Sequence, residues 1–342
     1  MKKIEFLRLL CAAALCTALC GCADMTDIEK IKSVAAIAVS DSAVTFCTVS
    51  VSAQEKTYDY EVYRFETDSI YDGMNMLAER TGKQPSLAHL TAVFFEDGCL
   101  QETIKNCVGS VVGGAESHPK AMAAFIDCAA QDFFDGIVVP SDSSMYRLLT
   151  DIPDDKFAAV TRCEMIELYY AVNLDDCALL PMFGVNGEGS IVRSGAVCVG
   201  TDSAVVTDSA VADAVSLAEN GSKPIYCTLS GGRAAVKTAS KKIWFDKDTD
   251  TAHIRLGLTY NFGRGANMKS AESELEHMIA DNLKTALELK NIGFDLLSLR
   301  RKAAGEFMTE KGYKKYVNEN GGGYFLRNMK YEIETEATEG DL

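Results

Sequence analysis

The sequence predicts an α+β fold (mixed α/β), with two to three domains in which small mixed sheets are flanked by helices. Three observations favour it. Some segments alternate apolar and polar residues with period two, as half-buried strands do. Others carry apolar residues at helical spacing. The two kinds follow one another without a regular βαβ rhythm, and about 320 residues after a signal segment usually exceed one core.

The chain begins with the pattern of an export signal. Lys2, Lys3 and Arg8 form a basic region, and residues 9–19 supply about eleven apolar or small residues. That length is typical of the apolar core of a signal peptide and is too short for a transmembrane helix. We therefore expect residues 1–21 to be a lipoprotein signal peptide.

The end of this signal, Leu19-Cys20-Gly21-Cys22, has the form of a lipobox. Cys22 follows the small Gly21 and fits the acylated position better than Cys20, which follows the bulkier Leu19. An ordinary secretory signal with incidental cysteines is the alternative. On the lipoprotein interpretation, acyl chains such as palmitate hold the mature protein at a membrane face without a spanning helix.

The charge balance limits the classes of partner. The full chain has a formal charge of −15, and removal of residues 1–21 leaves 31 Lys and Arg against 48 Asp and Glu, or −17. Nucleic acid and anionic lipid both favour basic surfaces, and no basic patch is evident. We therefore expect no nucleic-acid partner, and we expect the acyl chains rather than charge to provide the anchoring.

The part of the chain at residues 22–189 opens with strand patterns. Residues 34–39 and 44–51 predict a hairpin, and Thr67, Asp68 or Ser69 caps a helix that Gly82 ends. Further expectations are a buried strand at 89–95, either a strand and short helix or one helix at 121–134, and a helix at 156–172.

The part at residues 190–342 is expected to be a separate C-terminal domain, because residues 184–190 form the most loop-like interior segment. Residues 254–262 alternate with period two and predict a strand buried on one face. The other elements expected are a hairpin at 190–207, helices at 210–218, 270–290 and 295–310, and a closing strand at 329–333.

Residue types that carry catalysis or bind metals do not form a recognised motif. The four histidines form no H-x-x-H or H-E-x-x-H pair, and neither a Walker A loop nor a G-x-S-x-G motif is present. Close carboxylates such as Asp154-Asp155 and Asp175-Asp176 fall in predicted turns. The sequence therefore predicts a protein that is not an enzyme, with no catalytic residue, cofactor or metal site.

Eight cysteines remain after Cys22, and they are dispersed without a C-x-x-C pair. Most lie in apolar runs, where cysteine behaves as a small buried hydrophobic residue. Free thiols are favoured, although an even number in an exported protein also permits disulfides. The eight are Cys47, Cys99, Cys107, Cys128, Cys163, Cys177, Cys198 and Cys227.

The order of these features resembles the Ger(x)C (GerAC) family, the C-subunit lipoproteins of GerA-type spore germinant receptors. Three stretches match the family. The first is Gly21-Cys22-Ala23-Asp24 followed by an aliphatic strand. The second is a helix that leads to a Gly-Lys turn and then to the His89 strand, and the third is a central stretch from residue 178. In that stretch an aliphatic-Pro pair precedes a hairpin and a helix. Ala23 stands where the family has Trp.

The resemblance implies a non-enzymatic subunit of a nutrient receptor in spore germination. Cys22 would be the acylation site, and Asp24 and His89 match family positions for which we expect structural roles. The implied partners are the A and B membrane subunits of the receptor and the bilayer. The implied location is the outer face of the spore inner membrane.

Two other functions fit the sequence less well. A solute-binding lipoprotein of a membrane transporter needs two similar lobes around a cleft, usually of repeated βαβ units, and the predicted strand order does not offer them. An exported enzyme would need perturbed carboxylates or a metal in a cleft.

Overall fold

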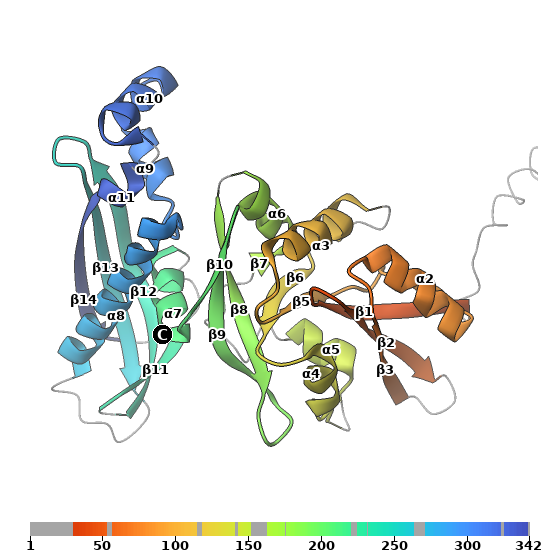
Figure 1. The fold of residues 1–342 in the computed structure, drawn as a ribbon. Coiled ribbons are helices and arrows are strands. Elements are labelled where there is room, and N and C mark those ends of the chain that lie inside the picture. The colour runs from red at the N-terminus through yellow and green to blue at the C-terminus, as the bar shows by residue number, and fades with distance from the viewer. Residues whose placement is uncertain are drawn as a thin grey trace, which may run out of the picture.

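The computed structural model describes residues 30–52, 57–114, 118–140, 143–151, 163–174, 176–219, 224–230, 232–262, 271–322 and 325–340. The fold is α+β, as predicted. Two mixed β-sheets lie side by side, and each is covered by helices (Figure 1).

The first sheet has ten strands, so it is larger than the small sheets expected. Its order is β10-β9-β8-β6-β5-β1-β2-β3, with β4 paired to β1 and β7 paired to β6. The central strands β1, β5, β6 and β8 are parallel, and an antiparallel pair of strands extends each side. The strands are β1 (Ile31–Val39), β2 (Val44–Ser52), β3 (Thr57–Phe65), β4 (Gln84–Ser86), β5 (Ala92–Glu96), β6 (Met122–Ile126), β7 (Cys163–Glu164), β8 (Cys177–Val185), β9 (Ile191–Gly200) and β10 (Ala204–Thr207).

Helices cover both faces of this sheet because its central strands are apolar on both sides. In β5, Val93 and Phe95 pack with one set of helices, whereas Ala92 and Phe94 pack with the other. The first set is α2 (Ile70–Thr81), α3 (Gln101–Gly113) and α6 (Met165–Asn173), and the second is α4 (Ala130–Gly136) and α5 (Met145–Asp151).

Several predicted elements of this half are confirmed in detail. The Ser69 hydroxyl caps α2 by accepting a hydrogen bond from the Asp72 N–H, and Gly82 ends the helix at φ 65°. Residues 121–134 form a strand followed by a short helix, which was one of the two alternatives. The helix expected at 156–172 is present from Met165, but Cys163–Glu164 is a strand and residues 152–162 lie outside the described residues.

The second sheet has the order β11-β12-β13-β14. The strands are β11 (Ile225–Leu229), β12 (Gly232–Asp246), β13 (Thr251–Phe262) and β14 (Lys330–Glu339), and β14 runs parallel to β13. The period-two prediction for β13 is confirmed, because Ile254, Leu256, Leu258, Tyr260 and Phe262 are all buried.

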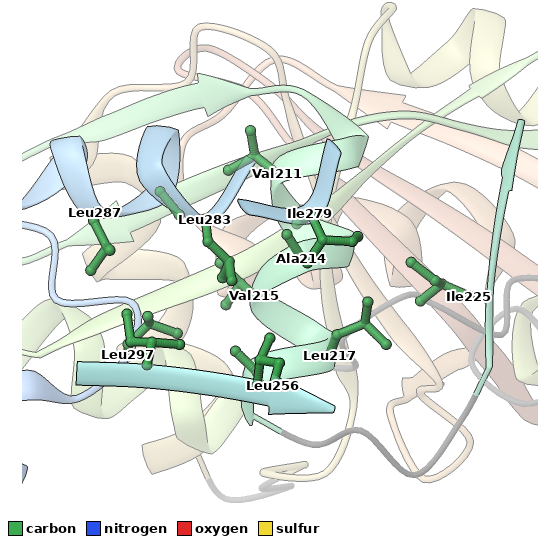
Figure 2. Packing of buried hydrophobic residues seen from close by; sticks show 14 of the residues in the cluster. Val211, Ala214, Val215, Leu217, Ile225, Leu256, Ile279, Leu283, Leu287 and Leu297 are labelled. Carbon is green, nitrogen blue, oxygen red and sulfur yellow. The ribbon is translucent and has the colours of Figure 1, made fainter. Parts of the chain in front are cut away.

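One face of this sheet packs against helices. They are α7 (Ser209–Glu219), α8 (Ala271–Glu288), the 3₁₀ helix η4 (Leu289–Ile292), α9 (Leu299–Gly305) and α11 (Phe325–Asn328). In Figure 2, Val215 of α7 lies near Leu283 of α8, and Leu256 of β13 lies near Leu217 of α7. The second core therefore brings α7, β13 and α8 together.

The single helix expected at 295–310 is wrong in its bounds. α9 begins at Leu299, because the Asp295 carboxylate accepts hydrogen bonds from the N–H groups of Leu299 and Arg300 at 2.7 and 2.8 Å. The helix ends at Gly305, and a separate helix α10 (Glu310–Glu319) follows. Phe307 lies between them, with its ring 4.9 Å from that of Tyr316, and packs in an aromatic cluster.

The division into domains at residues 22–189 and 190–342 remains a prediction. In the structure, residues 186–190 are the turn between β8 and β9, which pair with each other in the first sheet. The change from the first sheet to the second comes after Thr207, where α7 begins to pack against the second sheet.

Candidate functional site

The residues singled out from sequence do not come together. Cys22 and Asp24 lie outside the described residues. His89 is exposed just before β5, and its ring meets the Tyr146 ring edge-on at 6.2 Å. His277, which follows Glu276 in the sequence, is exposed on α8. Within the described ranges, no group of three or more His, Cys, Asp or Glu is placed to hold a metal ion.

The eight cysteines of the described part are free thiols. Burial raises the pKa of every one of them, to about 11 for Cys128 and Cys227 and to about 12 for Cys47, Cys99 and Cys198. Since the thiolate is the nucleophile, these cysteines are neutral and unreactive at physiological pH. Five of them, Cys47, Cys99, Cys107, Cys163 and Cys198, are buried core residues, and Cys128, Cys177 and Cys227 are partly buried.

A surface hollow of about 480 Å³ lies where β6 and β8 end. Asp127, Asp132 and Glu188 line it, together with the neutral Cys128 thiol. Gly189 is required in the adjoining turn, because its φ is +76° and a Cβ there would lie 2.2 Å from the Val138 side chain. The hollow is therefore acidic, and its lining includes no Lys, Arg or His.

The outer face of the second sheet carries a different arrangement. Seven side chains on three neighbouring strands point away from the helices, because they alternate with the buried residues of the same strands. We call this surface the Trp244 face, and it comprises Tyr226, Arg233, Lys237, Lys242, Trp244, His253 and Arg255.

Trp244 is the centre of the face and the single tryptophan of the chain. Its ring stacks on the His253 ring with a 4.8 Å separation and a 10° angle between planes. The Lys242 Nζ lies 4.7 Å from the Trp244 ring centre, and the Arg255 guanidinium lies 5.9 Å from it. These cation–π contacts hold two positive charges beside an aromatic surface.

The face contains a further cation–π pair, and acidic residues lie along one side of it. The Arg233 guanidinium lies 5.0 Å from the ring centre of Tyr226. On β14, Glu332 pairs with His253 at 3.1 Å, and Glu334 pairs with Arg255 at 2.5 Å. Arg255 lowers the pKa of the Glu334 carboxyl. The face is therefore cationic along β12 as far as Trp244 and acidic along β14, and Asp246 at the end of β12 adds a carboxylate that interacts with His253.

Sequence reasoning missed this face because the net charge of the whole chain concealed a local contrast. Residues 220–245 contain no Asp or Glu, and their five basic residues are Lys223, Arg233, Lys237, Lys241 and Lys242. That acid-free run was the available signal. The structure adds that Trp244 and three of these cations share one surface.

Among the helices of the described segments, none is both long enough and apolar enough to cross a bilayer.

Comparisons with known proteins give a likeness to solved structures and no match in sequence. No family model matches the chain, and no curated protein matches it. The solved structures that match include the crystal structure of the GerBC protein, with 11% sequence identity and a TM-score of 0.49 over 89% of this chain and 97% of that one. A likeness at this level fixes neither family nor function.

Proposed function

We propose that the chain is a member of the Ger(x)C family, namely a lipid-anchored, non-enzymatic C subunit of a nutrient germinant receptor. The carrying observation is the family pattern in the sequence, which extends over essentially the whole chain. Its elements occur here in the same order: α2 ended by Gly82, His89 before β5, the aliphatic-Pro pair in β8 before the hairpin of β9 and β10, then α7, and a closing strand.

In this role the acyl chains on Cys22 hold the protein at the outer face of the spore inner membrane. The partners are the A and B membrane subunits, and the C subunit contributes to receptor assembly or to signal coupling. The free thiols provide no activated cysteine nucleophile in the described part of the chain, because burial raises the pKa of each of them.

The shapes of the two sheets favour this proposal over a solute-binding lipoprotein. That class closes two similar lobes around a cleft. Here one sheet has ten strands with a parallel centre, and the other has four strands in a different order. The two halves are not similar lobes, so the transporter role is the second candidate only.

Germination of a deletion strain tests the proposal. We expect spores without the gene to lose their response to at least one nutrient, and the wild-type gene to restore it. The measurement is the fall in optical density after each nutrient is added, with related receptor genes also deleted. A normal response to every nutrient in that background would contradict the proposed role.

The same strain tests the anchor. Cys22→Ala should abolish incorporation of labelled palmitate and move the protein to the soluble fraction, because no acylated residue remains. Cys20→Ala is the matched control and should stay labelled and membrane-bound. A Cys22→Ala protein that remains labelled would show that the anchor lies elsewhere.

A further inference from the structure

We propose that the Trp244 face binds an extended, acidic segment of a partner protein. The proposal rests on the geometry and charge of this face and is independent of the proposed role in germination.

The face is open to a partner. The helices that pack on the second sheet bury residues of its other side, including Val236, Ile254 and Leu256. On the outer side, the Tyr226 side chain is 52% exposed, and that of Arg255 is 59% exposed. A sheet face with large aromatic and charged side chains exposed is suited to protein contact.

The side chains on the face are of the types that contribute most to protein interfaces. Trp, Tyr and Arg are the residues most enriched among those that dominate binding energy. The cation–π contacts and the Trp244–His253 stacking already restrict their rotamers. Binding would therefore cost little side-chain entropy.

The spacing of the cations suits an extended chain. Arg233, Lys237 and Lys242 lie on the same side of β12, four and five residues apart. At about 3.3 Å per residue, they are spaced by roughly 13–16 Å along the strand. An extended segment running along β12 would bring a carboxylate beside each of them every four to five residues.

The glutamates of β14 indicate whether a partner of this face is narrow or broad. Glu332, Glu334 and Glu336 lie on β14, which is two strands from β12 and hence about 10 Å away. A flat anionic membrane placed on the face would meet these carboxylates as well as the cations. A single extended segment is about one strand wide and meets the cations of β12 alone.

Fluorescence gives a direct test, because Trp244 is the only tryptophan. The purified protein, in neutral detergent, is titrated with a twelve-residue synthetic peptide that carries Glu at every fourth position between Ser and Phe. A lysine version of the same peptide is the control. We expect a saturable change in Trp244 emission with the acidic peptide only, weakened at least tenfold by 0.5 M salt.

Matched charge variants locate the site. Arg233→Glu with Lys242→Glu should weaken binding of the acidic peptide at least tenfold, and the milder Arg233→Gln with Lys242→Gln should weaken it by an intermediate factor. Lys314→Glu with Lys315→Glu makes the same change in net charge on α10, where both side chains are exposed, and should leave affinity within twofold. Circular dichroism confirms that each variant is folded.

Three outcomes would overturn the proposal. They are the absence of a saturable change, equal losses from the face variants and the α10 variants, and stronger binding of a broad anion. Vesicles of phosphatidylglycerol and a double-stranded DNA oligonucleotide serve as the broad anions. If either binds more tightly than the peptide and loses affinity in the face variants, the face is a membrane or nucleic-acid surface instead.

Discussion

At the scale of single residues, the pair Arg193–Asp213 joins the two halves of the molecule. Arg193 lies on β9 of the first sheet, and Asp213 lies on α7, which packs against the second. Both guanidinium NH groups donate to the carboxylate, at 2.5 and 2.7 Å, and both side chains are mostly buried. Burial raises the pKa of Asp213 although Arg193 acts to lower it.

Loss of Arg193 should therefore destabilise the fold. Arg193→Met leaves a buried carboxylate without its guanidinium partner, and we expect a loss of about 3–5 kcal/mol in the free energy of unfolding at pH 7, measured with urea. The folded pKa of Asp213 lies above the unfolded value, and it rises further in the variant. The loss of stability should thus be largest at pH values above the folded pKa of Asp213 in the variant, where the carboxylate is ionised. It should shrink as the pH falls through that value.

The double variant Arg193→Met with Asp213→Leu is the control for this pair. Because it removes both charges, it should recover much of the lost stability. A single variant that costs less than about 1 kcal/mol, or whose cost grows in acid, would contradict this account of the pair.

At the scale of elements, Asp295 sets where α9 begins. Its carboxylate accepts hydrogen bonds from two backbone N–H groups, those of Leu299 and Arg300, and burial raises its pKa. Asp295→Ala should lower the free energy of unfolding by about 1–2 kcal/mol, since both bonds are lost. Asp295→Asn keeps one acceptor oxygen and should lose less. Urea unfolding and amide exchange of residues 299–305 measure this, and equal losses in the two variants would contradict it.

Elements with strong periodicity could be predicted from the sequence, and polar ones could not. β13 alternates cleanly because one of its faces is buried, and α2 carries both a cap and a terminal glycine. β12 was missed because lysines and small residues cover its outer side, and its partner strands supply the pairing. α10 was missed because its apolar side is short: Tyr313, Tyr316 and Val317 pack against the second core, and none of its residues is fully buried.

At the scale of the whole molecule, the sequence indicated the fold class but not the extent of each sheet. The turn at residues 186–190 has the composition of a loop. That composition is the same whether the segment separates two domains or joins β8 to β9. The pairing of β8 with both β6 and β9 shows that the first sheet continues through this turn. Such pairing depends on contacts that a local pattern does not contain.

The candidate sites also differed in how far they could be predicted from the sequence. The signal and lipobox are local patterns and could be read directly. The Trp244 face combines side chains from β11, β12 and β13. In it, Trp244 of β12 stacks on His253, which lies opposite on β13. The register of the hairpin between β12 and β13 sets those two residues opposite each other, so placing them together required β12 to be recognised as a strand, and the acid-free run from residue 220 was the available signal for it.

The most direct test of the central claim is to isolate the protein from its own membranes. A tagged copy would be purified from detergent-solubilised spore membranes after cross-linking, with the Cys22→Ala strain as the matched control, and its partners identified by mass spectrometry. We predict two integral membrane proteins, the A and B subunits, in comparable amounts with the wild-type protein and their depletion with Cys22→Ala. Recovery of a transporter permease and its ATPase instead would contradict the receptor role.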